Sequence, residues 1–298
     1  MKEYAYAGHH MGTEVSLSFV CADKETADTM AQHAFATIHT YEQRFSRFLP
    51  KSDVTLLNQH GTHVVSDVCI AVLERSLELA RLTNYAFNPL VQVATLGYKD
   101  PDPHHTHNIH MTQDTSYSTD IGLIAYDRTS NRVTLGPAQQ IDFGGILKGY
   151  LAHLLADDCI HTQSTCTGCI VNIGGDIATR GVDVVHSPFI FLLYNPIVET
   201  ERPVTIQDAS LATSGTYARH WQTDKGPQHH IVDSTTQKNP TQDVVAVSII
   251  AQDGAYTEAL TKLFLTRGVT EALRLLPPET QHYKYFAVLA NGDSVHNL

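Results

Sequence analysis

Apolar side chains recur every three or four positions in several stretches of the chain, and this spacing is typical of amphipathic helices. On this basis we predict four helices, over residues 23–45, 66–84, 146–158 and 255–268. Asp23 stands where an N-cap is expected, and Gly268 stands where a helix C-cap commonly places glycine. Between the first two helices, Pro50, Ser52 and Asp53 predict turns.

Other stretches are continuously apolar or alternate between apolar and polar residues, which predicts β-strands. We place strands at residues 12–20, 170–173, 189–195, 230–233, 244–251 and 284–290. Asn291-Gly292 predicts a hairpin turn that joins the last two strands of the chain. Together these elements predict an α+β fold. We expect one compact unit over residues 1–298, with a mainly antiparallel sheet and flanking helices.

The charge of the chain narrows its range of partners. Its 298 residues contain 20 Lys and Arg against 31 Asp and Glu, for a formal net charge of −11. Binding to nucleic acid or to an anionic bilayer favours a basic surface, so we expect neither partner. No segment approaches the roughly 20 consecutive apolar residues of a membrane span. Because the first residues also lack the apolar core of a secretion signal, we expect a cytoplasmic protein.

Two groups of metal-ligating residue types leave alternatives open. One is a possible zinc site that combines residues close in sequence, namely Cys159, His161, Cys166 and Cys169. Its spacing matches no standard zinc ribbon, and we favour ordinary core and loop thiols. The other is a histidine-rich tract within residues 100–118, with His104, His105, His107 and His110. Such a tract can bind a transition metal, although a solvated loop is the more common role.

Two glycine-containing motifs suit an anionic ligand. Residues 142–150, DFGGILKGY, open a predicted helix with two glycines, where free backbone N–H groups favour phosphate, and Lys148 adds a positive charge one turn in. Tight helix packing is the alternative explanation for these glycines. Residues 170–176, IVNIGGD, place Asp176 at the end of a buried strand. There its carboxylate can accept hydrogen bonds from a ribose or a base, or bond its own turn.

Two further patterns carry side chains with acid–base or metal chemistry. His230 lies in the segment HHIVD, where an imidazole can act as a general acid or base beside a phosphate. Glu258, Thr261 and Lys262 share one face of a predicted helix. An acid and a hydroxyl at this spacing can share a hard cation, whereas a Glu–Lys surface pair is the simpler explanation.

The order of these motifs is more specific than any one of them. The segments that carry the resemblance are MGT (11–13), SRFLPKSDVTLLN (46–58), AFNPLV (86–91), DFGGILKGY (142–150), NIGGD (172–176), TSGTY (213–217), HHIVD (229–233) and the helix at 255–268. In order and spacing they resemble the ApbE family of FAD:protein FMN transferases over nearly the whole chain. The resemblance implies that FAD is split at its pyrophosphate with Mg2+. FMN then passes to a Thr or Ser hydroxyl of an acceptor flavoprotein through a phosphoester.

The resemblance also implies roles for individual residues. A flavin or nucleotide pocket would be lined by Met11, Phe48, Ala86, Phe87 and Asn88. FAD would be held by Gly144, Lys148 and Tyr150, with Asp176 near its adenosine end. The segment His230-Ile231 would flank the pyrophosphate, with His230 as the candidate acid or base.

The metal site is where this chain departs from the family pattern. The pattern Asp-Ala-Leu-Ala-Thr becomes Glu258-Ala259-Leu260-Thr261-Lys262 here. The implied Mg2+ ligands are Glu258, which would also be catalytic, Thr261 and the backbone carbonyl of Leu147. Lys262 has three donors and no acceptor, so it cannot bind a cation but can pair with Glu258. Two interpretations follow: an active transferase with an altered metal site, or an FAD-binding protein with weakened catalysis or slow FAD pyrophosphatase activity.

Overall fold

A computed structural model of the protein describes residues 1–97, 117–162, 165–280 and 282–298. Its centre is an eight-stranded sheet in which every neighbouring pair of strands is antiparallel. Across the sheet the strands are β1 (Lys2–His10), β2 (Thr13–Cys21), β6 (Cys166–Ile173), β7 (Asp176–Gly181), β10 (Ser210–Gly215), β13 (Val244–Ala251), β14 (Lys284–Leu289) and β15 (Ser294–His296). The predicted α+β class with a mainly antiparallel sheet is confirmed.

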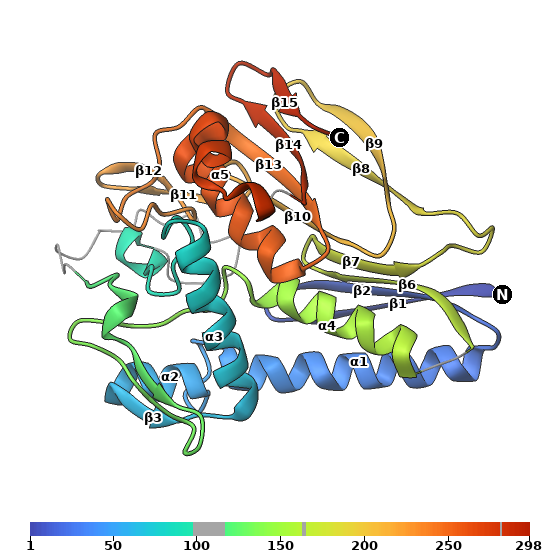
Figure 1. Ribbon diagram of the computed structural model, residues 1–298, viewed down its shortest axis with the longest axis horizontal. Helices are drawn as coiled ribbons and strands as arrows, with labels where there is room; N and C mark the ends of the chain where they lie inside the picture. Colours follow the sequence, from blue (N-terminus) through green and yellow to red (C-terminus); the bar gives the residue numbers. More distant parts are fainter. Residues whose placement is uncertain (98–116, 163–164, 281) are drawn as a thin grey trace.

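Three long helices cover one face of this sheet (Figure 1). Helix α1 (Lys24–Phe45) lies against β1 and β2, α4 (Leu147–Thr162) against β6 and β7, and α5 (Gly254–Leu275) against β10 and β13. The side chain of Asp23 accepts a hydrogen bond from Thr26 N at 2.8 Å, so the predicted N-cap of α1 is confirmed. None of the described helices is long and apolar enough to cross a bilayer.

Strand β13 is buried on both faces of the sheet, because its alternate residues belong to two different hydrophobic clusters. Val247 and Ile249 pack toward α5, whereas Ala246 and Ile250 pack on the opposite face. That opposite face is covered by a two-stranded ribbon of β8 (Phe189–Asn195) and β9 (Thr200–Ile206). A strand that alternates between two apolar layers reads as continuously hydrophobic, as β13 does.

The remaining elements cluster around the end of the molecule that carries α2 (Asp53–His60) and α3 (Asp67–Leu82) (Figure 1). They are a small sheet of β3 (Thr62–Val64), β5 (Arg132–Thr134) and β4 (Ala125–Asp127), a ribbon of β11 (His220–Thr223) and β12 (Gly226–His229), and the 3-10 turns Val93–Leu96 and Ile121–Leu123. A further 3-10 turn, Pro278–Thr280, lies next to the start of α5, where the Tyr256 hydroxyl donates to the Thr280 carbonyl at 2.6 Å. The predicted turn at Asn291-Gly292 joins β14 and β15, with Gly292 at φ 90°.

The structure corrects the predictions for residues 230–233 and Ser52. Residues 230–233 do not form a strand, because Asn239 Nδ2 donates to the carbonyls of His229 and Ile231 at 2.7 Å and holds this segment as a loop. At Gly268 the backbone is non-helical (φ 74°, ψ 166°), so the predicted end of the helix falls at a kink, and a second helical segment continues to Leu275. Ser52 caps the unpredicted helix α2, which is too short to show a clear apolar period.

Candidate functional site

One pocket gathers most of the residues that the sequence singled out. It lies where the first turn of α4, the turn between β6 and β7, the end of β10 and the first half of α5 meet (Figure 1). The segments after α3 and after β12 complete its wall. Of the predicted site residues, the pocket is lined by Ala86, Phe87, Asn88, Gly144, Lys148, Asp176, His230, Ile231 and Glu258.

A buried carboxylate between two lysines forms the centre of this pocket. Glu258 is only 1% exposed, and its Oε2 lies 3.2 Å from Lys262 Nζ. Its Oε1 accepts a hydrogen bond from Gly149 N at 2.6 Å and lies 3.9 Å from Lys148 Nζ. Burial raises the pKa of Glu258, but Lys148, Lys262 and the Gly149 N–H outweigh burial and hold this pKa below its ordinary value. Glu258 is therefore ionised.

A close helix crossing makes this contact possible. A Cβ atom on Gly149 of α4 would lie 2.3 Å from the carbonyl oxygen of Gly254, which opens α5. A Cβ on Gly254 would lie 2.0 Å from the carbonyl oxygen of Gly149. Because neither residue has a side chain, the two backbones touch, and Glu258 on the next turn of α5 reaches the Gly149 N–H.

Lys148 links the two acidic groups of the pocket. Its Nζ forms an ion pair with Asp176 Oδ2 and also faces Glu258. Burial lowers the pKa of Lys148; Glu258 opposes this effect, while the charges of Lys262 and Arg219 add to it. An anionic ligand would favour the charged form of this ammonium group. The glycine-rich turn before α4 therefore leads into a helix whose half-buried Lys148 reaches the pocket.

His230 lies in the wall of the pocket as a neutral imidazole. Its Nδ1 lies 3.3 Å from the carbonyl oxygen of Arg219. Burial lowers the pKa of His230 to about 3, and the charges of Arg219 and Lys262 contribute to this shift. A neutral imidazole has a free nitrogen lone pair that can accept a proton or a hydrogen bond. It adds no positive charge to the pocket.

Two of the residues expected to hold Mg2+, Glu258 and Thr261, have other partners in the structure. Thr261 is fully buried, and its hydroxyl lies 2.7 Å from the carbonyl oxygen of Glu258 and 2.8 Å from Ser214 Oγ. Leu147 is buried in the core, and neither Leu147 nor Thr261 lines the pocket. The carboxylate of Glu258 already pairs with the Lys262 ammonium. A positive group therefore stands beside the one acidic ligand that Mg2+ would need.

Three other predicted pocket residues lie outside its lining. The backbone N–H of Met11 donates to Glu42 Oε1 at 2.7 Å, and its side chain packs against the core. Phe48 is 53% exposed, and its ring lies 5.0 Å from the guanidinium carbon of Arg47. Tyr150 packs toward Tyr41, with 6.5 Å between the ring centroids.

The sequence analysis missed two cationic residues that line the pocket. Arg47 pairs with Asp142, and Arg219 lies in the loop between β10 and β11. Arg47 lies within the segment SRFLPKSDVTLLN that carries the resemblance, and Arg219 lies two residues after the segment TSGTY. The sequence signal for both arginines was therefore a positive charge in or next to a motif that predicts nucleotide binding.

The cysteines of the alternative zinc site lie in the core. All five cysteines are free and buried, and Cys159, Cys166 and Cys169 belong to one hydrophobic cluster. The side chain of His161, the fourth residue of that alternative, lies outside the described part of the structure. The tract of His104, His105, His107 and His110 lies outside the described residues.

The comparisons with known proteins agree with this geometry. A model of the ApbE family matches residues 11–287. The chain belongs to the ApbE family. Proteins named FAD:protein FMN transferase are similar to this ApbE chain over most of both lengths. One from Klebsiella pneumoniae is 25% identical, over 92% of this chain and 85% of the relative. One from Treponema pallidum is 27% identical, over 93% of this chain and 82% of the relative.

Solved ApbE structures show the same fold. The ApbE protein of Thermotoga maritima superposes with a TM-score of 0.85 at 23% identity, over 99% of this chain and 97% of that one. The apo flavinyl transferase ApbE of Pseudomonas stutzeri gives a TM-score of 0.83 at 19% identity, over 99% of this chain and 94% of that one. The ApbE-like fold expected from the sequence is therefore confirmed.

Proposed function

We propose that this chain is an FAD:protein FMN transferase. It would split FAD between its two phosphates and join FMN to a Thr or Ser hydroxyl of an acceptor flavoprotein. Membership of the ApbE family and the names of its relatives support this activity. The observation that carries it here is the convergence of Lys148, Lys262 and Arg219 on one pocket in a chain of net charge −11.

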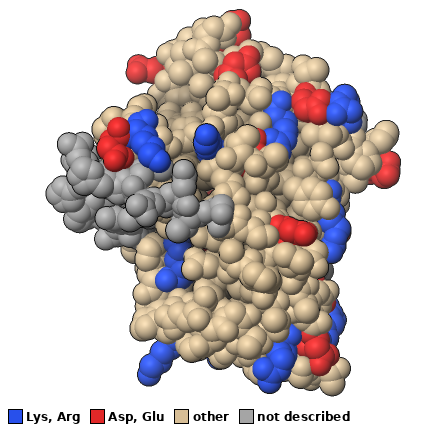
Figure 2. Space-filling view, turned by 90° about the vertical axis from the view of Figure 1, so that its left-hand side faces the viewer, with Lys and Arg blue, Asp and Glu red and all other residues tan. Residues whose placement is uncertain are grey.

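The charges of the pocket suit a diphosphate. Four cationic side chains line it, those of Arg47, Lys148, Arg219 and Lys262, against three carboxylates. Elsewhere, on the face shown in Figure 2, Lys and Arg are interspersed with Asp and Glu, and no continuous basic stripe crosses its visible described surface. Two unit charges 4 Å apart attract by about 4 kcal/mol at the effective dielectric of a protein surface. Lys148 and Lys262 would therefore attract the phosphates of a ligand that lies beside them in the pocket.

We infer the following reaction and the role of each residue in it. The acceptor hydroxyl oxygen attacks the phosphorus of the FMN half, a new P–O bond forms, and the P–O bond to the AMP half breaks. AMP leaves with the bridging oxygen and its electron pair. His230 would take the proton of the hydroxyl, since its imidazole is neutral before FAD binds and an anion beside it would raise its pKa. Lys148 and Lys262 would offset the charge that develops on the phosphates.

The two ends of FAD would contact different walls of the pocket. We assign Ala86, Phe87 and Ile231 to an apolar wall, with the amide of Asn88 beside them. Asn88 also fixes the loop after α3, since its side chain donates to the carbonyl of Thr119 at 2.8 Å. Gly144 and Asp176 would face the phosphates and the adenosine. Met11, Phe48 and Tyr150 would then support the pocket from outside its lining.

The Mg2+ expected from the resemblance does not fit the residues present. Glu258 is paired, Thr261 is committed to other partners, and Lys262 brings an ammonium to the same carboxylate. We propose that Lys262 supplies, together with Lys148, the positive charge that the family pattern assigns to a metal. The proposed transfer would then proceed without Mg2+.

A second candidate function rests on the same ion pair. With Glu258 paired to Lys262, the chain would bind FAD and release it unchanged. The two functions are separated by mixing the purified protein with FAD and an acceptor domain that carries the threonine motif of the family. A fluorescent acceptor band after denaturation supports the transferase. FAD binding without such a band supports the binding protein.

Three further predictions concern the domain organisation, the acceptor residue and the cellular location. We propose that residues 1–298 act as one unit, because the pocket takes residues from Arg47 to Lys262. The Thr or Ser acceptor and the cytoplasmic location stay predictions.

A further inference from the structure

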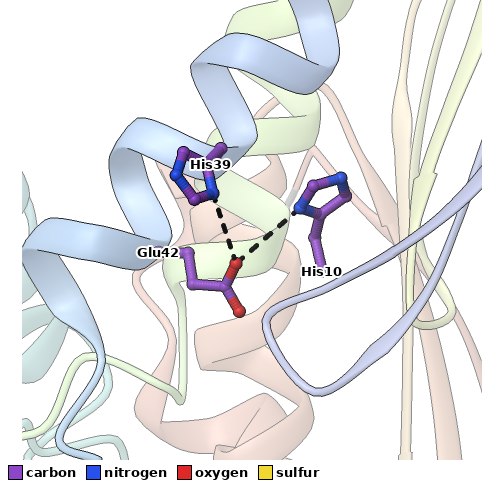
Figure 3. A group of neighbouring side chains, drawn as sticks. All are labelled: His10, His39 and Glu42. Atoms are coloured by element: carbon purple, nitrogen blue, oxygen red, sulfur yellow. Dashed lines mark ion pairs between the residues drawn. The ribbon is translucent and has the colours of Figure 1, made fainter. Parts of the chain in front are cut away.

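A second cluster of chemically active side chains lies outside the pocket. It combines His10, at the end of β1, with His39 and Glu42, which lie one turn apart on α1 (Figure 3). One ligand atom from each of the three residues lies within 4.8 Å of the other two. Within the described part of the chain, no other group of three His, Cys, Asp or Glu meets this condition.

The ligand atoms of this cluster are close together but too far apart for good hydrogen bonds. Glu42 Oε2 lies 3.7 Å from His10 Nδ1 and 4.0 Å from His39 Nδ1. Both separations exceed the 2.7–3.2 Å of a good N–H···O hydrogen bond by about half an ångström or more. A metal about 2.1 Å from each of three ligands needs ligand atoms about 3.0–3.5 Å apart. A contraction of at most about 1 Å in the two Glu42 distances, and of under about 2 Å between the imidazoles, would bring the three atoms to that spacing.

The carboxylate is already oriented for this role. Glu42 Oε1 accepts a hydrogen bond from the backbone N–H of Met11 at 2.7 Å, which turns Oε2 toward both imidazoles (Figure 3). The ring of His10 stacks on Phe35, with centroids 5.6 Å apart and planes 29° apart. Contacts of this kind fix the orientation of metal ligands in known sites. The side chain of His39 is 61% exposed, so one side of the cluster is open to water.

The ligand types decide the class of metal. Two imidazoles and one carboxylate suit zinc and neighbouring divalent transition metals, whereas Mg2+ and Ca2+ prefer oxygen ligands alone. We propose that His10, His39 and Glu42 bind Zn2+ or a similar divalent transition metal, with water completing its coordination.

The position of this site suggests a structural task near the pocket. It would join α1 to the turn between β1 and β2, where Met11 has φ 53°. Thr13 follows that turn, and a Cβ on Gly174 would lie 2.5 Å from Thr13 Oγ1. Gly174 lines the pocket. A metal at His10, His39 and Glu42 would therefore stabilise the hairpin that packs against the pocket wall.

The test is a metal titration on the full-length protein. Zn2+ is added to metal-free protein in competition with a chromophoric chelator, and Co2+ is added separately to record its visible absorption. Both use a background in which residues 104, 105, 107 and 110 are alanine, so that the histidine tract contributes no signal. We expect one equivalent of Zn2+, a Co2+ spectrum of low coordination number, and a higher Tm with Zn2+.

Two variants and one control make the result specific. His39→Ala removes an exposed ligand, and Glu42→Gln keeps an oxygen for the Met11 N–H while removing the charge. Each should lower Zn2+ affinity at least tenfold and abolish the Tm shift. His33→Ala is the matched control, since it is also exposed on α1 and pairs with Asp158 at 3.1 Å. Equal Zn2+ binding by His33→Ala and His39→Ala, or no Zn2+ binding by the background protein, would overturn the proposal.

Discussion

Lys262 Nζ lies 3.2 Å from Glu258 Oε2, and this ion pair occupies the helix face that the family pattern gives to a metal. Lys148 approaches the other oxygen of the same carboxylate at 3.9 Å. The pocket thus contains a cluster of two half-buried ammonium groups and two buried carboxylates, with Asp176 as the fourth member. All four charged groups are side chains of the protein, so substitution of any one of them should change the stability or the ligand affinity of the pocket.

Removal of the central carboxylate should destabilise the protein. Glu258→Gln leaves Lys148 and Lys262 close together without the charge that compensates them. We expect the free energy of unfolding to fall by about 3 kcal/mol, as when one partner of a buried ion pair is removed. Urea denaturation measures the change. Glu271→Gln, which breaks an exposed pair with Arg274, should change stability little. Equal effects of the two variants would show that the Glu258 cluster is not buried as described.

The helix crossing should tolerate no side chain at Gly149. In Gly149→Ala the new Cβ would lie 2.3 Å from the Gly254 carbonyl oxygen, so α4 and α5 must separate. We expect a loss of about 3 kcal/mol in the free energy of unfolding. Gly144→Ala is the control, because its Cβ would meet only the Asp142 side chain, at 3.1 Å. If both variants unfold at the same urea concentration, the close crossing is not needed.

His230 should make the protein less stable as the pH falls. The unfolded chain takes up a proton near the ordinary histidine pKa of about 6.5, whereas the folded chain resists it until about 3. Between these values the unfolded state binds more protons, so the free energy of unfolding decreases with falling pH. His230→Gln should remove about 2 kcal/mol of this loss at pH 5. Denaturation of both proteins at pH 7 and pH 5 measures it, and an unchanged pH dependence in the variant would contradict the burial of His230.

Arg219 should contribute to FAD affinity without supporting the fold. It is exposed at the pocket, so Arg219→Ala is expected to leave stability nearly unchanged. Loss of one charged contact to a phosphate should weaken FAD binding about tenfold. Quenching of FAD fluorescence gives the affinity. Arg202→Ala, in β9 and outside the pocket, should bind FAD as the native chain does. A similar loss in both variants would place FAD elsewhere.

The sequence predicted the elements that have a strong period and missed those fixed by side-chain hydrogen bonds. Helix α1 was found because its buried residues recur every three or four positions, and β13 was found because its residues are nearly all apolar. Helix α2 has eight residues and starts at the hydroxyl of Ser52, which also suits a turn. Residues 230–233 looked like a strand, but the Asn239 side chain takes the hydrogen bonds of a neighbouring strand.

In the candidate site, too, the sequence predicted some features and missed those that depend on side-chain packing. Most residues that line the pocket lie in the motifs quoted from the sequence. Because an ammonium group can only donate hydrogen bonds, the sequence also predicted that Lys262 can pair with Glu258, and the structure shows this pair. The motifs did not show that Thr261 turns toward Ser214 or that Tyr150 packs on Tyr41. Those contacts depend on how α4, α5 and the sheet pack together, which one sequence does not specify.

The most direct test of the account is the Mg2+ dependence of FMN transfer. Native protein and Lys262→Thr are mixed with FAD and an acceptor domain in metal-free buffer, and Mg2+ is then titrated in. Lys284→Thr, at an exposed position in β14, is the matched control. The same series in a His39→Ala background separates the pocket from the proposed zinc site. In-gel flavin fluorescence of the denatured acceptor measures transfer.

We predict that the native chain labels the acceptor without Mg2+ and gains little from it. Lys262→Thr should label the acceptor only when Mg2+ is added, because Glu258 is then free to bind a cation. Transfer by the native chain that appears only with Mg2+ would contradict the role given to Lys262. Transfer by Lys262→Thr alone would show that the native chain binds FAD without passing FMN on.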